Sequence, residues 1–194
     1  MQLYYSPLAC SLADHIALLE ADVAFEPVRV DLRTRKVVSG GALAAISAKA
    51  YVPVLVLDDG AVLTENIAIL DWIATTRPAL GLAGPLGRTR LLEALAYIAT
   101  EIHRSFKPFW HDAGVAERQK AAAAIAGQLH FLADSLQGRY LFGAAPGVAD
   151  CYLFVMLLWA ARFTLDVPPP LEALRDALAA RPAAQRALHT EGLL

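Results

Sequence analysis

The chain has 194 residues, of which 57% are hydrophobic and 19% are charged. This length suits one large domain or two small packed domains, and the composition excludes an intrinsically disordered chain. A formal net charge of −2 provides no positive field that would gather nucleic acid or an anionic membrane. Two cysteines are too few for a disulfide framework, so we expect a protein of a reducing compartment.

Neither a signal peptide nor a membrane span is predicted. Residues 1–5 lack a charged segment followed by a long apolar core. The longest apolar stretch, residues 151–161, is 11 residues long, whereas a membrane span needs about 20. We therefore expect a cytoplasmic protein with neither a nucleic acid nor a membrane among its partners.

The first elements along the chain predict a small mixed sheet with helices. A strand is expected over residues 2–5 and a helix over residues 11–21. A second strand is expected over residues 25–30, at the edge of the sheet because Pro27 removes a ladder donor. Residues 42–46 predict a weak helix.

A β-hairpin and a helix are expected next. Two apolar runs, residues 54–57 and 61–63, flank a short Asp-Gly turn at residues 58–60. Thr64 is then expected to cap a helix that Pro78 ends. The predicted order of this half is therefore β-α-β-α-β-β-α.

The second half of the chain is helical in pattern. Residues 78–87 hold two prolines and three glycines without periodicity, so we expect a linker between a domain of residues 1–77 and a domain of residues 88–194. The predicted helices span residues 88–107, 115–136, 148–163, 170–180 and 183–190. The third of them is apolar nearly all round, which predicts the core of a helical domain. The expected fold class is an α/β N-terminal domain plus an all-α C-terminal domain.

Cys10 lies at the predicted mouth of the first helix. Ser11 and Asp14 form a [ST]-x-x-[DE] pattern that opens the apolar periodic run. A helix N-terminus carries partial positive charge and unpaired N–H donors, which favour an anion and lower the pKa of a thiol. The sequence thus favours thiol chemistry, either by Cys10 itself or on a sulfur-bearing ligand beside it. The alternative is a small buried hydrophobe, which is the role expected for Cys151.

Three further features each fit a structural or a ligand-binding role. Val52-Pro53 predicts an extended backbone that can offer N–H and C=O groups to a peptide-like ligand, or an ordinary strand start. Glu65 and Asn66 begin a helix, where N–H groups can bind a carboxylate and Glu65 can pair with an ammonium group, or where they simply cap it. A basic cluster consists of Arg29, Arg33, Arg35 and Lys36. It is either a solvated edge or a site for one small anion. Together these features suit glutathione, which has acid, peptide and amino-acid parts and brings a thiol.

A set of short motifs carries a resemblance to a known family. In the first half they are Leu3-Tyr4-Tyr5-Ser6-Pro7, Ala9-Cys10-Ser11-Leu12, Val30-Asp31-Leu32-Arg33, Val52-Pro53-Val54-Leu55, Leu57-Asp58-Asp59-Gly60 and Leu63-Thr64-Glu65. In the second half they are Tyr97-Ile98-Ala99-Thr100-Glu101-Ile102-His103, Val148-Ala149-Asp150, Tyr152-Leu153-Phe154 and Trp159-Ala160. Their combination resembles the bacterial beta class of cytosolic glutathione transferases nearly end to end. The resemblance implies a thioredoxin-like N-terminal domain, an all-helical C-terminal domain, a homodimer and glutathione as cosubstrate.

The resemblance also implies roles for individual residues. Cys10 would lie by the glutathione sulfur, and His103 would reach the same site from the helical domain. The Val52 backbone would pair with the cysteinyl part of glutathione, and Glu65 with Asn66 would hold its γ-glutamyl end. The expected glutathione-binding residues are Arg35, Lys36, Tyr51, Val52, Pro53, Glu65 and Asn66, with Arg35 or Lys36 near the glycine carboxylate.

An apolar cleft between the domains is expected to hold a second substrate. Its candidate residues are Phe106, Phe109, Trp110 and Trp159, with core packing as the favoured role of Trp159. His15 is expected to have a structural role. The other histidines, His111, His130 and His189, have no acidic or cysteine partner at ligand spacing, so no metal is expected.

The chain departs from the family pattern in three places. The family usually has Asn-Pro-Lys-Gly-Gln before Val-Pro, but residues 47–51 read Ser-Ala-Lys-Ala-Tyr, which is expected to reshape the loop over glutathione. Asn66 replaces the Ser or Gly common in the family, and Gly147 replaces a Ser or Thr before the helix that contains Asp150.

The expected reaction is attack of glutathione thiolate on a hydrophobic electrophile, as in detoxification. Two alternatives stay open. Cys10 could form a mixed disulfide with glutathione and exchange it with other thiols. The chain could instead be a non-catalytic carrier of glutathione or of an apolar ligand.

Overall fold

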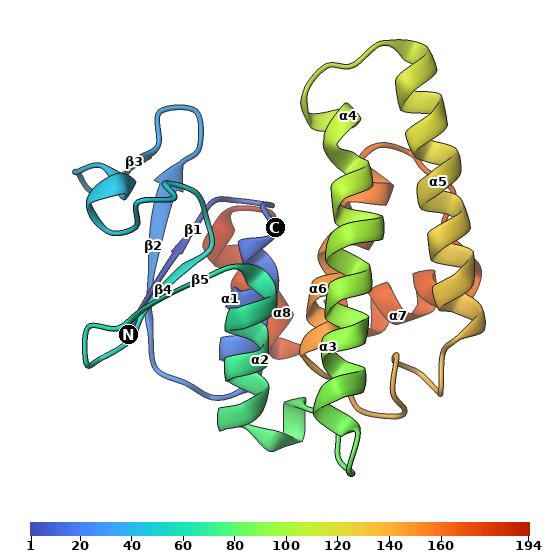
Figure 1. Ribbon diagram of the computed structural model, residues 1–194, viewed down its shortest axis with the longest axis horizontal. Helices are drawn as coiled ribbons and strands as arrows, with labels where there is room; N and C mark the ends of the chain where they lie inside the picture. Colours follow the sequence, from blue (N-terminus) through green and yellow to red (C-terminus); the bar gives the residue numbers. More distant parts are fainter.

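The computed structural model describes residues 1–194 and shows a mixed sheet beside a set of helices (Figure 1). The strands are β1 (Gln2–Tyr5), β2 (Glu26–Asp31), β3 (Lys36–Val37), β4 (Val54–Val56) and β5 (Val62–Thr64), in the spatial order β3-β2-β1-β4-β5. β1 and β2 are parallel, and every other neighbouring pair is antiparallel. The predicted fold class, a mixed α/β domain followed by a helical domain, is confirmed.

Two helices lie between the sheet and the helical domain (Figure 1). They are α1 (Ser11–Glu20) and α2 (Asn66–Thr76). α1 contacts β1 on one side and α2, α6 (Val148–Arg162) and α8 (Pro182–Glu191) on others. Its residues 11–18 are therefore all buried, and its apolar periodicity reflects contact with both halves of the molecule.

β2 is not the edge strand that Pro27 predicts. β3, which the sequence pattern did not reveal, pairs with residues 30–31 of β2 and forms the edge instead. Pro27 lies opposite Leu3 of β1, on the part of β2 that β3 does not cover. The missing proline donor is therefore compatible with an inner strand, because β3 is only two residues long.

Two further local expectations were wrong in detail. Thr64 is the last residue of β5, and Glu65 occupies the cap of α2 with a left-handed φ of 73°. The weak helix expected over residues 42–46 is a single 3₁₀ turn, Leu43–Ala45. The hairpin itself forms as predicted, with Leu55 of β4 opposite Leu63 of β5.

The helical domain is built around α6. The surrounding helices are α3 (Gly87–Tyr97), α4 (Lys107–Trp110), α5 (Val115–Asp134), α7 (Pro169–Ala179) and α8. Nearly every residue of α6 is buried, as its all-round apolar sequence predicts. No helix in the molecule combines the length and apolarity that a membrane crossing needs.

The helix expected over residues 88–107 is interrupted. α3 ends at Tyr97, a π turn spans Ile98–Ile102, and a 3₁₀ turn spans His103–Phe106 before α4 begins. These segments still follow one another as a single rod beside α5 (Figure 1). A π turn contains one more residue than an α turn, so it rotates the side chains that follow it. The side chain of His103, directly after this turn, therefore has a different direction around the helix axis from the one that an uninterrupted α-helix would give it.

The start of α6 is bonded to the preceding loop and lies close to the backbone of Leu80, in the segment between the two domains. The carboxylate of Asp150, which is 1% exposed, accepts hydrogen bonds from the backbone N–H groups of Leu141 and Gly147, both at 2.8 Å. A Cβ atom at Gly147 would lie 2.9 Å from the carbonyl oxygen of Leu80. Glycine at this cap thus permits a backbone approach that the serine or threonine usual in the family would obstruct.

Candidate active site

A cavity of about 360 Å³ lies where the two domains meet. The N-terminal domain contributes residues 7–10, Leu32, Tyr51 and Val52 to its wall. The helical domain contributes His103, Trp110, His111 and Trp159. The wall is mostly apolar, but it places one thiol and two imidazoles around a space large enough for a small organic ligand.

Cys10 caps the N-terminus of α1 without forming the expected capping pattern. Its Sγ lies 4.0 Å from the carbonyl oxygen of Val52. The hydroxyl of Ser11 turns away from the helix and bonds with the backbone of Ser6. Both carboxylate oxygens of Asp14 are buried without a hydrogen-bond partner. The helix therefore starts where the pattern predicts, but neither side chain of the pattern caps it.

The predicted lowering of the Cys10 pKa was wrong. Burial of the thiol raises its pKa to about 12, and the carboxylate of Asp14 one turn along α1 raises it further. Hydrogen bonding by the backbone at the helix start acts in the opposite direction but is the smaller effect. Desolvation of a thiolate thus outweighs the helix N-terminus here, and Cys10 is a neutral thiol at neutral pH.

His103 is held against two aromatic side chains of α6. Its Nδ1 lies 2.6 Å from the hydroxyl oxygen of Tyr152, and its ring meets Trp159 edge to face at a centroid distance of 5.0 Å. Burial lowers the pKa of His103 to about 4, so the imidazole is neutral at neutral pH. The rod that contains α3 and α4 and the core helix α6 together position this imidazole on the cavity wall.

The loop that precedes Cys10 is tied to the helical domain at Leu8, which has a left-handed φ of 58°. The Nε1–H of Trp159 donates to the Leu8 carbonyl at 2.8 Å, and the Leu8 N–H donates to Glu191 of α8 at 3.0 Å. Glu191 is also paired with His15 of α1 at 2.9 Å, in keeping with the structural role expected for this histidine. Both domains therefore determine where Cys10 lies.

The residues expected at the γ-glutamyl end lie beside the cavity. Glu65 accepts hydrogen bonds from the Tyr51 hydroxyl, at 2.5 Å, and from the Lys49 ammonium group. The side-chain amide of Asn66 donates to the carbonyl of Cys10 at 3.2 Å. These bonds connect the loop of residues 47–51, the start of α2 and the start of α1.

The altered loop keeps a conformation that suits glycine. Ala50 has a left-handed φ of 51°, at the position where the family usually has glycine. Alanine adopts this backbone less readily, so the loop is strained by about 1 kcal/mol relative to glycine. The Val52-Pro53 peptide bond, which directly follows this loop, is cis.

Several predicted residues do not line the cavity. Arg35 is exposed in the segment that joins β2 and β3, and Lys36 is exposed as the first residue of β3. Arg29 and Arg33 of the basic cluster border a separate hollow that adjoins the cavity at Leu32. The basic cluster is thus spread along an exposed edge.

Two of the four candidate aromatic residues lie behind the wall. Phe106 is fully buried and packs edge to face on Trp159 at 5.4 Å, whereas Phe109 packs on Phe163 at 5.0 Å. Trp110 does line the cavity. Trp159, a cleft candidate for which core packing was the favoured role, lines it as well, because a residue at the border of a core can contact both the core and a cavity.

Tyr152 and His111 were not singled out as site residues from the sequence. Tyr152 and Trp159 are seven residues apart, which is two helical turns and therefore one face of α6. That spacing was the sequence signal that could have placed both residues on the face of α6 next to the site. It was not recognisable because the other faces of α6 are apolar too, so that no polar stripe distinguishes one face from another.

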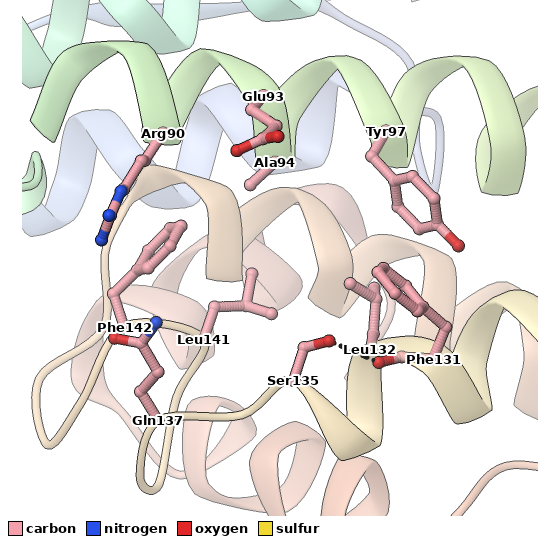
Figure 2. A pocket seen from close by; sticks show the side chains of 10 residues that line it. All are labelled: Arg90, Glu93, Ala94, Tyr97, Phe131, Leu132, Ser135, Gln137, Leu141 and Phe142. Carbon is pink, nitrogen blue, oxygen red and sulfur yellow. Dashed lines mark hydrogen bonds between the residues drawn. The ribbon is translucent and has the colours of Figure 1, made fainter. Parts of the chain in front are cut away.

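A second cavity, of about 280 Å³, lies between α3 and the C-terminal end of α5 (Figure 2). Its wall includes Tyr97, Phe131 and Phe142, with Arg90 and Glu93 on the α3 side. It contains neither a cysteine nor a histidine. Thiol chemistry therefore belongs to the cavity between the domains.

Comparisons with known proteins agree with this geometry. Family models described as the N-terminal and C-terminal domains of glutathione S-transferase match residues 9–76 and 95–182. The chain is 36% identical to "Glutathione S-transferase GstA" of Escherichia coli O157:H7, with 100% of both chains covered. It is 38% identical to "Glutathione S-transferase GST-4.5" of Xanthomonas campestris, also over 100% of both.

Solved structures are similar over the whole chain. A sphingomonad glutathione S-transferase complexed with glutathione is 42% identical, with a TM-score of 0.92 and 100% of both chains covered. A bacterial beta-class enzyme from Sphingomonas chungbukensis is 40% identical, with a TM-score of 0.91 and the same coverage. With both family models matched and relatives similar from end to end, this chain belongs to the glutathione S-transferase family, in its bacterial beta class.

Proposed function

We propose that this glutathione transferase conjugates the thiolate of glutathione to hydrophobic electrophiles in the cavity between its domains. The observation that carries the proposal is the meeting of Cys10 and His103, from different domains, on one largely apolar cavity wall. The glutathione sulfur would lie between them, and the electrophile would contact Trp110 and Trp159. An apolar cavity favours the binding of such an electrophile, and a bound electrophile that displaces water would favour the reaction of a desolvated thiolate.

Glutathione would lie along the N-terminal wall. Its cysteinyl part would pair with the backbone at Val52, beside Tyr51 and Pro53, and its γ-glutamyl ammonium would meet Glu65. Asn66 and the start of α2 would hold the γ-glutamyl carboxylate. The glycine carboxylate would meet the basic cluster, with Arg35 and Lys36 acting from its outer edge.

Cys10 would act as a thiol rather than as the attacking nucleophile. Because burial raises its pKa to about 12, its S–H is available as a weak donor to the glutathione sulfur. His103, neutral because burial lowers its pKa to about 4, can donate a second hydrogen bond to the same sulfur. Both donors would stabilise the thiolate of glutathione and so lower the pKa of the nucleophile.

Disulfide exchange is the second candidate function, because the Cys10 sulfur lines the cavity and could form a mixed disulfide. The raised pKa of Cys10 favours conjugation over exchange, since exchange needs a thiolate. We also propose a homodimer in the cytoplasm, a detoxifying role, and a domain division at residues 1–77 and 88–194 joined by residues 78–87. The dimer is testable by light scattering at micromolar protein, where a monomeric mass would contradict it.

Two assays test the function. Millimolar glutathione should raise the melting temperature of the protein, because a ligand that binds only the folded state stabilises it. Steady-state turnover should be measured with a chloronitroaromatic and with a mixed disulfide of glutathione. Conjugation without exchange supports the proposal, exchange alone supports the second candidate, and binding without either supports a carrier.

A Cys10→Ala variant separates the two chemistries within one protein. We expect it to abolish any disulfide exchange and to leave conjugation reduced but measurable, because the conjugating nucleophile is glutathione's own sulfur. Complete loss of conjugation in a folded variant that still binds glutathione would contradict the role proposed for Cys10.

A further inference from the structure

We infer that Tyr152 is a positioning residue that holds His103 in the tautomer whose free N–H, on Nε2, faces the bound thiol. The inference rests on the proposed function, because it concerns how His103 would stabilise the thiolate. Tyr152 does not itself line the cavity and acts only through His103, to which it is hydrogen-bonded. The buried hydroxyl of Tyr152, on α6, lies beside the Nδ1 atom of His103, which lines the cavity.

The hydroxyl of Tyr152 is a donor in this contact. Tyr152 is 1% exposed, and burial raises its pKa far above the ordinary tyrosine value, so the hydroxyl keeps its proton. Its one hydrogen bond is to His103 Nδ1, at 2.6 Å. A buried O–H is normally paired, and Nδ1 is the acceptor that pairs it.

A neutral imidazole has one donor and one acceptor nitrogen. Since burial keeps His103 neutral, a proton on Nδ1 would make this nitrogen the donor to the Tyr152 oxygen and would leave the buried hydroxyl proton without an acceptor. It would also leave Nε2 bare, as an acceptor, where the proposed function needs a donor. The bond from Tyr152 therefore selects the tautomer with Nδ1 bare and Nε2 protonated.

The ring cannot easily turn to exchange its two nitrogens. Trp159 and Tyr152 each meet the His103 ring edge to face, with interplanar angles of 80° and 88°. Both belong to α6, two turns apart, and that helix is buried almost throughout. The π turn before His103 rotates this side chain towards them.

The charged groups near the pair do not offer another partner. On the cavity wall the other titratable side chains are Cys10, Tyr51 and His111. The carboxylates of Asp14 and Glu65 act on the pKa of Tyr152 only through space and make no bond to its hydroxyl. Both carboxylates raise the Tyr152 pKa and so help to keep the hydroxyl protonated.

The first test reads the tautomer directly in the intact protein. Imidazole ¹⁵N–¹H spectra, with the His103 signals assigned by their loss in His103→Ala, should show a protonated Nε2 and a bare, hydrogen-bonded Nδ1. In Tyr152→Phe the hydrogen-bonded Nδ1 signal should disappear and the second tautomer should become populated. A wild-type spectrum with a protonated Nδ1 would overturn the inference, whatever the activity.

The second test is a double-mutant cycle of Tyr152→Phe with His103→Ala. In the wild-type background we expect Tyr152→Phe to raise the apparent pKa of bound glutathione and to lower kcat/KM about three- to tenfold. In the His103→Ala background it should change neither quantity. An equal loss in both backgrounds would mean that Tyr152 acts structurally, and no loss in either would mean that its hydroxyl positions nothing.

Tyr97 is a matched control for Tyr152, because its hydroxyl also bonds one side chain but does so away from the cavity between the domains. Tyr97→Phe removes a tyrosine hydroxyl that bonds Gln128, outside the cavity, and should leave the pH–rate profile unchanged. Full activity of His103→Ala would overturn the role proposed for His103 and this inference with it. If His103→Ala lowers turnover as expected but Tyr152→Phe leaves the pH–rate profile unchanged, the inference alone is overturned and the proposed function stays intact.

Discussion

The two walls of the cavity differ in how firmly their polar groups are held. On the N-terminal wall, Glu65 bonds with Lys49 and Tyr51, and these side chains are about half exposed. On the helical wall, His103 bonds with the buried Tyr152 against the buried Trp159. Exposed pairs exchange partners at little cost, whereas buried ones do not. The first wall is therefore suited to binding a charged ligand, and the second to presenting one donor in a fixed direction.

Cys10 lies between the two walls and depends on both. Its helix belongs to the N-terminal domain, but the preceding Leu8 is tied to Trp159 and Glu191 of the helical domain. Burial by both sides makes its thiolate unfavourable. The helical half thus fixes not only its own donor but also the environment of the thiol.

The largest expected effect concerns the reactivity of Cys10 in the absence of glutathione. With its pKa raised to about 12, its thiolate fraction at neutral pH should be at least about a hundredfold below that of a free thiol. Alkylation by iodoacetamide should be correspondingly slow and should rise about tenfold per pH unit from pH 7 to pH 10. Mass spectrometry of the Cys10 peptide measures the rate, and the urea-unfolded protein is the control. A plateau above pH 8 in the folded protein would contradict the raised pKa.

The next largest effect is expected on the stability of the helical domain, when the hydrogen bonds of Asp150 at the start of α6 are removed. Asp150→Ala removes the acceptor of two backbone N–H groups, those of Leu141 and Gly147, near the start of this helix. We expect the free energy of unfolding to fall by about 3 kcal/mol or more, measured by urea unfolding. Asp176→Ala, an exposed carboxylate on α7, is the control and should change stability by less than about 0.5 kcal/mol. Similar effects of both substitutions would show that these hydrogen bonds are dispensable.

His103→Ala tests the donor of the helical wall. Loss of a hydrogen bond to the thiolate should raise the apparent pKa of bound glutathione and lower turnover about tenfold or more. Because the pKa of His103 is about 4, the wild-type pH–rate profile should rise with thiol ionisation and show no inflection from His103 between pH 5 and 8. Unchanged turnover and an unchanged profile in the folded variant would make His103 a structural residue.

The smallest effect is expected on the N-terminal wall. Lys49 pairs with the carboxylate that the ammonium of glutathione would need, so Lys49→Ala should tighten glutathione binding, by less than about fivefold because the pair is exposed. Calorimetric titration measures the Kd, and Lys120→Ala on α5 is the control for loss of one positive charge. Weaker binding in Lys49→Ala would mean that the ammonium contacts the ligand instead of competing with it.

Local pattern was enough for most elements of the fold. β1, α1, the β4–β5 hairpin and helices α5 to α8 lie within a few residues of their predicted positions. Each has a clear period or a turn signal within its own segment, which is the information that a single sequence contains. β3 was missed because two residues have no period. The interruption before His103 was missed because a π turn leaves no local signature.

Local patterns were sufficient to predict the two-part architecture and the residue types of the site, because periodicity, glycine–proline breaks and short motifs each lie within a short segment. The chemistry of these residues depended on tertiary packing. Burial by distant segments raised the pKa of Cys10 against the effect of the helix end. The face of α6 turned towards His103 made Tyr152 and Trp159 its partners, and left Phe106 behind the wall. Desolvation and side-chain direction depend on what packs around a residue, and that is a property of the folded chain.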